Sequence, residues 1–161
     1  MPANLVHDAH RHIGLLPAFP FYGGPPVHPD SGARGTVAEL IADLDAEGTE
    51  RTLVLPNYGV PDASVSFSFN ELVLEAAAAD DRIRCGLWVS PRPQDAELNK
   101  AALALVGEKG VKALKTSFLL GGAADDPACA PQIEQIFETA RANGLVVHIH
   151  TSRSEERRVG K

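Results

Sequence analysis

Cysteine is scarce in this sequence of 161 residues, which contains only Cys85 and Cys129. The two lie far apart and form no CxxC pair, so the sequence predicts neither a disulfide framework nor a zinc site built from cysteines. Also missing are the leader of a secretory signal and any run of about 20 apolar residues that could span a bilayer. We therefore expect buried thiols, a cytoplasmic location and no membrane partner.

An excess of positive charge is missing as well. The chain has 15 basic and 21 acidic residues, which gives a formal net charge of −6. Nucleic acids and anionic membranes attract basic surfaces, so this balance argues against both as partners. A small-molecule substrate is the better expectation. The hydrophobic content of 44% is sufficient for one sizeable core.

Short apolar segments alternate with segments of helical periodicity along the whole chain. The pattern predicts strands at 5–9, 52–55, 83–89, 111–116 and 145–150, and helices at 36–48, 70–79, 95–108 and 130–142. Strands that are apolar throughout, separated by helices, are typical of a parallel α/β sheet. Two architectures fit this order: a complete five-stranded open sheet, or about the first five strands and four helices of a (β/α)8 TIM barrel. Length alone favours the open sheet.

Two His-X-His pairs stand at the ends of predicted strands, His10 with His12 and His148 with His150. Residues two apart in a strand share a face, so each pair presents two imidazoles side by side. Asp8 has the same parity as His10 and His12, and we expect its carboxylate to bond backbone amides. One such pair would be as easily structural as functional, whereas two pairs in one β/α array favour a metal site with open positions.

The surroundings of these histidines resemble motifs of the amidohydrolase-related superfamily. The segment DAHRHIG at 8–14 resembles the DxHxHxG that ends the first strand of those barrels. GVKALK at 110–115 is similar to the fourth-strand GVxGIK, and GLVVHIHT at 144–151 is similar to the fifth-strand GLPVxIHTG. The elements follow the family's order and spacing. The resemblance implies a TIM barrel, of which this chain would supply the N-terminal part.

The resemblance also implies the site residues. His10 and His12 would be metal ligands of the first strand, His150 a ligand of the fifth, and the cofactor a divalent metal, with zinc as first choice. Lys115 would be a catalytic residue, either carbamylated and bridging two metals or paired with a substrate carboxylate; a structural ion pair is the plain alternative. His148 lies one layer deeper than His150, so we expect packing or hydrogen bonding behind the ligands.

The implied function is a metal-dependent hydrolase, in which metal-activated water cleaves a C–N or C–O bond of a small, carboxylated substrate. A non-oxidative decarboxylase of the same superfamily is the first alternative, and a non-catalytic open-sheet binding domain is the second. We assign residues 1–151 to the barrel and interpret 152–161 as a disordered or non-native tail, which a sequencing artefact would explain. A homo-oligomer is compatible with the full-length protein.

Overall fold

The computed structural model describes residues 6–17, 19–20, 26–27, 33–58, 62–118 and 122–150. Its elements follow the chain in the order β1 (Val6–Ile13), β2 (Phe19–Pro20), β3 (Pro26–Val27), α1 (Val37–Glu47), β4 (Thr49–Pro56), α2 (Ala63–Ala79), β5 (Ile83–Trp88), the short 3-10 helix η1 (Pro93–Asp95), α3 (Ala96–Leu103), β6 (Val111–Ser117), α4 (Ala130–Asn143) and β7 (Val146–His150). The predicted tail at 152–161 and part of the predicted loop between β1 and α1 lie outside the described residues.

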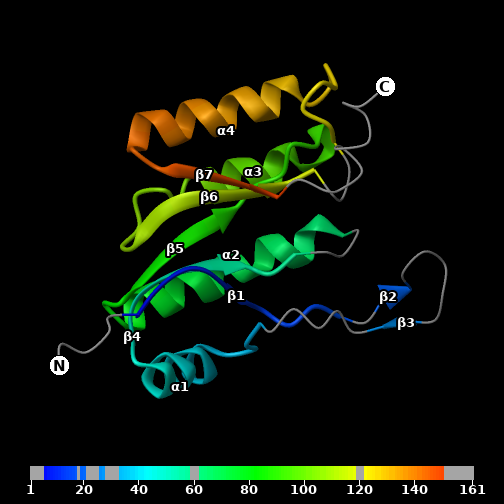
Figure 1. The fold of residues 1–161 in the computed structure, drawn as a ribbon. Coiled ribbons are helices and arrows are strands. Elements are labelled where there is room, and N and C mark those ends of the chain that lie inside the picture. Colours follow the sequence, from blue (N-terminus) through cyan, green and yellow to red (C-terminus); the bar gives the residue numbers. More distant parts are fainter. Residues whose placement is uncertain are drawn as a thin grey trace, which may run out of the picture.

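Five parallel strands form one sheet in the spatial order β1-β4-β5-β6-β7, which is also their order along the chain (Figure 1). A doubly wound open sheet reverses direction at a switch point, because later strands lie on the other side of the first one. This sheet has no such reversal. Its strands follow one another in a curved sheet, as the first strands of a barrel do. The partial TIM barrel is therefore confirmed, and the open-sheet alternative is wrong.

Capping residues explain where the helices begin and end. The Thr36 hydroxyl accepts a hydrogen bond from the Glu39 amide, and the Glu39 carboxylate accepts one from the Thr36 amide. Gly48 ends α1 in the left-handed region with φ of +66°. Helix α2 begins seven residues before the predicted start, because Asp62 caps it through the Ser64 amide and the serine-rich first turns hide the apolar pattern. Helix α3 ends at Leu103, before the predicted end, and turns lead from there to β6.

The core lies between the sheet and its helices. Alternate strand residues such as Val54, Leu87 and Leu114 are fully buried against helical residues such as Leu40 and Val73. The opposite, concave face of the sheet carries the larger polar and aromatic side chains described below. The side chains of this face are closely packed around Gly86. A Cβ at this position would lie 2.6 Å from the Leu55 side chain and 3.1 Å from the Cβ of Ala113.

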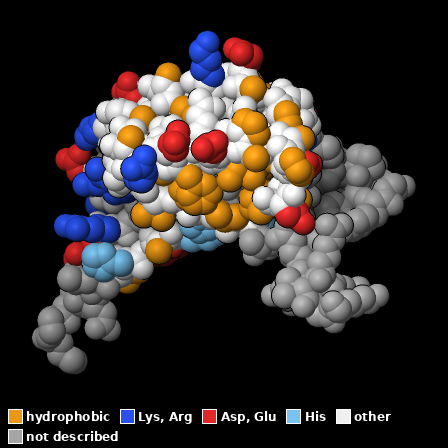
Figure 2. Space-filling view, turned by 90° about the horizontal axis from the view of Figure 1, so that it is seen from above, with side chains coloured by type: hydrophobic (Ala, Val, Ile, Leu, Met, Phe, Trp, Pro, Cys, Tyr) orange, Lys and Arg blue, Asp and Glu red, His pale blue; other side chains and the backbone are white. Residues whose placement is uncertain are grey.

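The outer surface mixes charges of both signs with apolar side chains. Figure 2 shows hydrophobic side chains gathered on the face that carries α4, with acidic side chains beside them. In α4 only Ile136 and Ala140 are buried, while Phe137 is 46% exposed. Both cysteines are buried and free, as predicted. Within the described residues, no helix has the length and apolar composition that crossing a membrane requires.

Candidate metal centre

Strand β1 brings the first histidine pair together on the concave face. The Nε2 atoms of His10 and His12 lie 2.9 Å apart, and the Nδ1 atom of His12 lies 3.2 Å from the carbonyl oxygen of Pro56 on β4. If Nδ1 of His12 donates to that carbonyl, its Nε2 carries the lone pair and faces His10. A backbone partner on the far ring nitrogen is the usual arrangement of histidines that bind metals.

The same histidines line a hollow of about 270 Å³ beside β1. The other charged residues of the hollow are paired with one another. Arg11 bonds Asp8 at 2.8 Å and Glu47 of α1 at 2.5 Å, and Arg34 pairs with Asp43. The imidazoles are thus the lining groups with nitrogen lone pairs to offer a cation.

Asp8 departs from the simple strand parity that the sequence suggests. Asp8 aligns with Thr52 of β4 and Arg11 with Val54, so β1 fits one extra residue into this interval. This irregularity places Asp8 beside Arg11 rather than with His12. Its carboxylate accepts a hydrogen bond from the His10 amide at 3.0 Å, which confirms the predicted backbone contact and fixes the backbone that carries His10.

Among the described residues, Lys115 on β6 is the largest charged side chain that is fully buried, with 0% exposure. Its Nζ atom lies 2.9 Å from Nδ1 of His148 on the neighbouring strand β7, and 4.8 Å from the ring centre of Tyr58. The His148 ring in turn lies 4.6 Å from the His10 ring. No described carboxylate forms an ion pair with Lys115, so the structural ion pair considered from the sequence is not observed in this part of the chain.

Tyr58, two residues after the end of β4, contacts the residues of this group from several strands. Its ring centre lies 5.5 Å from that of His12 and 5.2 Å from that of His150, both edge-on. Trp88, at the end of β5, stacks on Tyr58 at 5.1 Å with an angle of 19° between the ring planes. Sequence reasoning missed both residues. The signal that could have found them is their place at the carboxyl ends of two successive strands.

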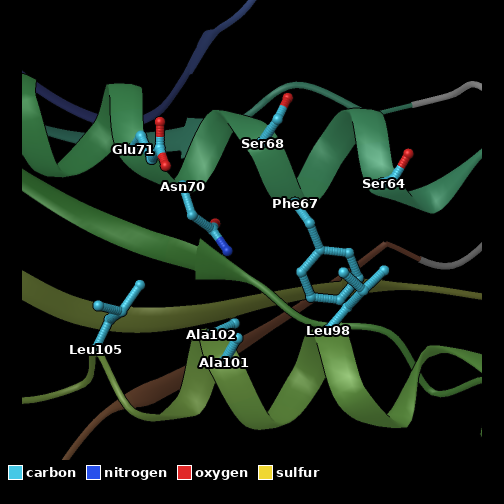
Figure 3. A pocket seen from close by; sticks show the side chains of 9 residues that line it. All are labelled: Ser64, Phe67, Ser68, Asn70, Glu71, Leu98, Ala101, Ala102 and Leu105. Atoms are coloured by element: carbon cyan, nitrogen blue, oxygen red, sulfur yellow. The ribbon is translucent and has the colours of Figure 1, made fainter.

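Two buried asparagines hold these aromatic residues in place. Asn57 donates from Nδ2 to the Gly14 carbonyl and accepts from the Tyr58 amide with Oδ1, both at 2.9 Å. Asn70 of α2 accepts from the Trp88 amide at 2.7 Å and donates to its carbonyl at 3.2 Å. Figure 3 shows Asn70 pointing from α2 toward the sheet, at the base of a groove of about 350 Å³ between α2 and α3. That groove lies on the helical side and contains no histidine.

Burial and the Lys115 charge set the protonation of the site. Burial lowers the pKa of Lys115 to about 8, and burial with the nearby His10 and Lys115 lowers the pKa of His12 to about 4. Burial first and the Lys115 charge second lower the pKa of His10, and the same two causes act on His148 and His150. The histidines are therefore neutral at pH 7, which is the form that binds metals.

The structure brings some predicted residues together more closely than others. His10 and His12 converge through their Nε2 atoms, and Lys115 and His148 join them from β6 and β7. The ring of the third predicted ligand, His150, packs edge-on against Tyr58 instead. Within the described residues, no group of three or more histidine, cysteine, aspartate or glutamate side chains is arranged to hold a metal ion. The donor chemistry of the His10 and His12 pair nevertheless fits a divalent cation, because two neutral imidazoles point at one spot.

Comparison with known sequences decides the family. A family model described as amidohydrolase matches residues 8–160, nearly the whole chain. This chain belongs to the amidohydrolase family. The match begins at Asp8, the first residue of the histidine motif DAHRHIG. No curated protein matches the chain.

Solved structures agree with this amidohydrolase assignment at the level of the fold. The IDCase of Metarhizium anisopliae in apo form has a TM-score of 0.63 and 16% identity, and the match covers 92% of this chain and 51% of that one. A probable 2-pyrone-4,6-dicarboxylic acid hydrolase of Acinetobacter baumannii, with citric acid bound, has a TM-score of 0.52 and 16% identity, with 89% and 48% covered. The chain thus spans about half the length of the solved structures it matches, as expected for a partial barrel.

Proposed function

We propose that this amidohydrolase-family chain carries the N-terminal part of the active site of a metal-dependent hydrolase that cleaves a C–N or C–O bond. The observation that carries the proposal is the convergence of the His10 and His12 Nε2 atoms at 2.9 Å, on the concave face and at the carboxyl ends of the parallel strands. Binding and catalytic groups of (β/α) barrels collect at that end. Zinc is the proposed metal, since neutral imidazoles suit it and both cysteines are buried elsewhere.

Each residue of the site has a proposed role. His10 and His12 would hold the metal, with His150 as the third ligand from β7. A bound divalent ion lowers the pKa of a coordinated water toward neutrality and polarises a substrate carbonyl. Lys115, held by His148, supplies a positive group that a ligand carboxylate or a carbamate on its own amine would neutralise. We further propose a small carboxylated substrate and a cytoplasmic location, in keeping with free, buried thiols.

Decarboxylation is a second candidate reaction, favoured by one observation. The Lys115 cation has no described carboxylate partner, so a carboxylate-bearing ligand would meet an uncompensated positive charge. Such a charge suits orientation of a carboxylate before its loss as carbon dioxide. On the whole protein, release of carbon dioxide without uptake of water would identify a decarboxylase. Uptake of one water per product pair would identify a hydrolase.

Zinc binding tests the proposed metal centre. Metal-free protein is titrated with zinc by calorimetry, and metal content after dialysis is measured by elemental analysis. Wild type should retain about one zinc per chain, and His10→Ala/His12→Ala should lose this binding. The matched control is His7→Ala, which removes an exposed histidine from the same strand and should bind zinc as wild type does. Equal zinc retention by the double variant would refute the proposed site.

A further inference from the structure

Tyr58 has a rigid place next to two proposed metal ligands. Its ring contacts His12 on one side and His150 on another, and it is stacked on Trp88. Its backbone amide is bonded to Asn57, which is itself only 2% exposed. A ring held by three neighbouring rings and a fixed backbone loses little freedom when a ligand binds.

The hydroxyl group of Tyr58, by contrast, has no hydrogen-bond partner among the described residues, although its ring is so closely held. Two further donors lie close to this ring. Lys115 offers an ammonium group over the Tyr58 ring, and the indole N–H of Trp88 is buried without a partner. A buried donor without an acceptor is costly, so the unpaired Trp88 indole favours a ligand that brings acceptors to this place.

The charge of the site points to the same kind of ligand. Lys115 has no ion pair with a carboxylate in the described part of the chain, and Asp8, the carboxylate on the strand of His10 and His12, is already bonded to Arg11. Nearby cations stabilise an incoming anion, and they do so more strongly where water is excluded. A carboxylate carries two acceptor oxygens and one negative charge, so it would accept from the unpaired donors and also balance the charge of Lys115.

We infer that Tyr58 is a substrate-binding residue, whose hydroxyl donates a hydrogen bond to a carboxylate of the ligand beside the proposed metal centre. The inference rests on the proposed function for the location of the ligand, but Tyr58 itself follows from its contacts. The donor is at the tip of a side chain that follows β4, which is the direct neighbour of β1 in the sheet and lies across the concave face from β7. Tyr58 would therefore select substrates by their oxygen acceptors, while Trp88 keeps its ring in place.

The test uses isophthalate as a probe dicarboxylate. Trp88 is the single tryptophan of the chain and stacks on Tyr58, so its fluorescence reports on this site. Saturation-transfer NMR of the isophthalate protons provides a second, independent readout. Wild type should bind isophthalate more tightly than the neutral isophthalamide, and Tyr58→Phe should weaken isophthalate binding about tenfold, the size expected for one hydrogen bond to a charged acceptor.

The controls separate this inference from the proposed function. Ser68→Ala removes an exposed hydroxyl from α2 and should leave isophthalate binding unchanged. Tyr58→Phe should keep the zinc affinity and the urea midpoint of wild type, because the ring contacts remain. Equal isophthalate affinity in wild type and Tyr58→Phe, or no isophthalate binding by wild type, would overturn the role of Tyr58 even if zinc binds. Loss of zinc binding in Tyr58→Phe would also overturn it, by making Tyr58 part of the metal centre itself. Failure of the His10→Ala/His12→Ala zinc test, with the Tyr58 effect intact, would overturn only the proposed metal function.

Discussion

Replacing Lys115 with methionine should stabilise the fold at neutral pH. The side chain is 0% exposed and has no described carboxylate partner, so its ammonium group is buried at a net cost. Burial lowers its pKa from 10.5 to about 8. At about 1.4 kcal/mol per pKa unit, this difference corresponds to a folding cost of about 3 kcal/mol at pH 7.

Part of this gain is lost with the contacts that the amine makes. Lys115→Met removes the contact with His148 and the cation–π contact with Tyr58, which together are worth about 1–2 kcal/mol. The expected net effect at pH 7 is therefore a stabilisation of about 1–2 kcal/mol. The folded state sheds its Lys115 proton near pH 8 and the unfolded state near pH 10.5. The cost is thus fully present below pH 8 and disappears as the pH rises to 10.5, where the variant should have lost its advantage.

Urea unfolding followed by circular dichroism at pH 7 and pH 10.5 measures this difference. Lys112→Met is the matched control, because Lys112 is an exposed lysine on the same strand. It should change the free energy of unfolding by less than about 0.5 kcal/mol at either pH. The reasoning is refuted if Lys115→Met is less stable than wild type at pH 7, or if its advantage is the same at both pH values.

Substitutions at three further positions test local supports of the site and of the fold, each by urea unfolding. Asn57→Ala leaves the Gly14 carbonyl and the Tyr58 amide without the Asn57 side chain as partner, and should lower the free energy of unfolding by about 2–3 kcal/mol. An effect below about 1 kcal/mol would contradict a supporting role for these two hydrogen bonds. Gly14→Ala should be at least as costly, since φ is +106° and the new Cβ would lie 2.5 Å from the Phe69 ring; a neutral result would show that the turn can shift. Thr36→Ala should cost about 1 kcal/mol through loss of the capping box, and Thr36→Ser should restore most of it.

The regular parts of this fold could be predicted because they depend on local patterns. Helix α1 follows from an apolar repeat between Thr36 and Gly48, and both ends are in place as capping chemistry requires. The strands follow from apolar runs stopped by proline or glycine. Length favoured the wrong architecture, and the strand order, which excludes the open sheet, is a property of long-range pairing that no local pattern contains.

The candidate site could be predicted only where residues share a strand. The contact between His10 and His12 follows from their spacing, and so does the common face of His148 and His150. The approach of Lys115 to His148 depends on the register of β6 with β7, in which these two residues are direct partners. Tyr58 lies beyond the end of β4, so its place depends on the hydrogen bond to Asn57 and on the contact with Trp88 rather than on a periodic pattern in the sequence.

Direct observation of the metal ligands tests the central claim most sharply. X-ray absorption at the zinc edge is recorded on the zinc-loaded chain and on His10→Ala/His12→Ala. The account predicts a first shell of nitrogen and oxygen at about 2.0–2.1 Å with the outer-shell signal of at least two imidazoles, absent from the variant. A first shell of sulfur at about 2.3 Å, or an imidazole signal that survives in the variant, would contradict a metal centre built on His10 and His12.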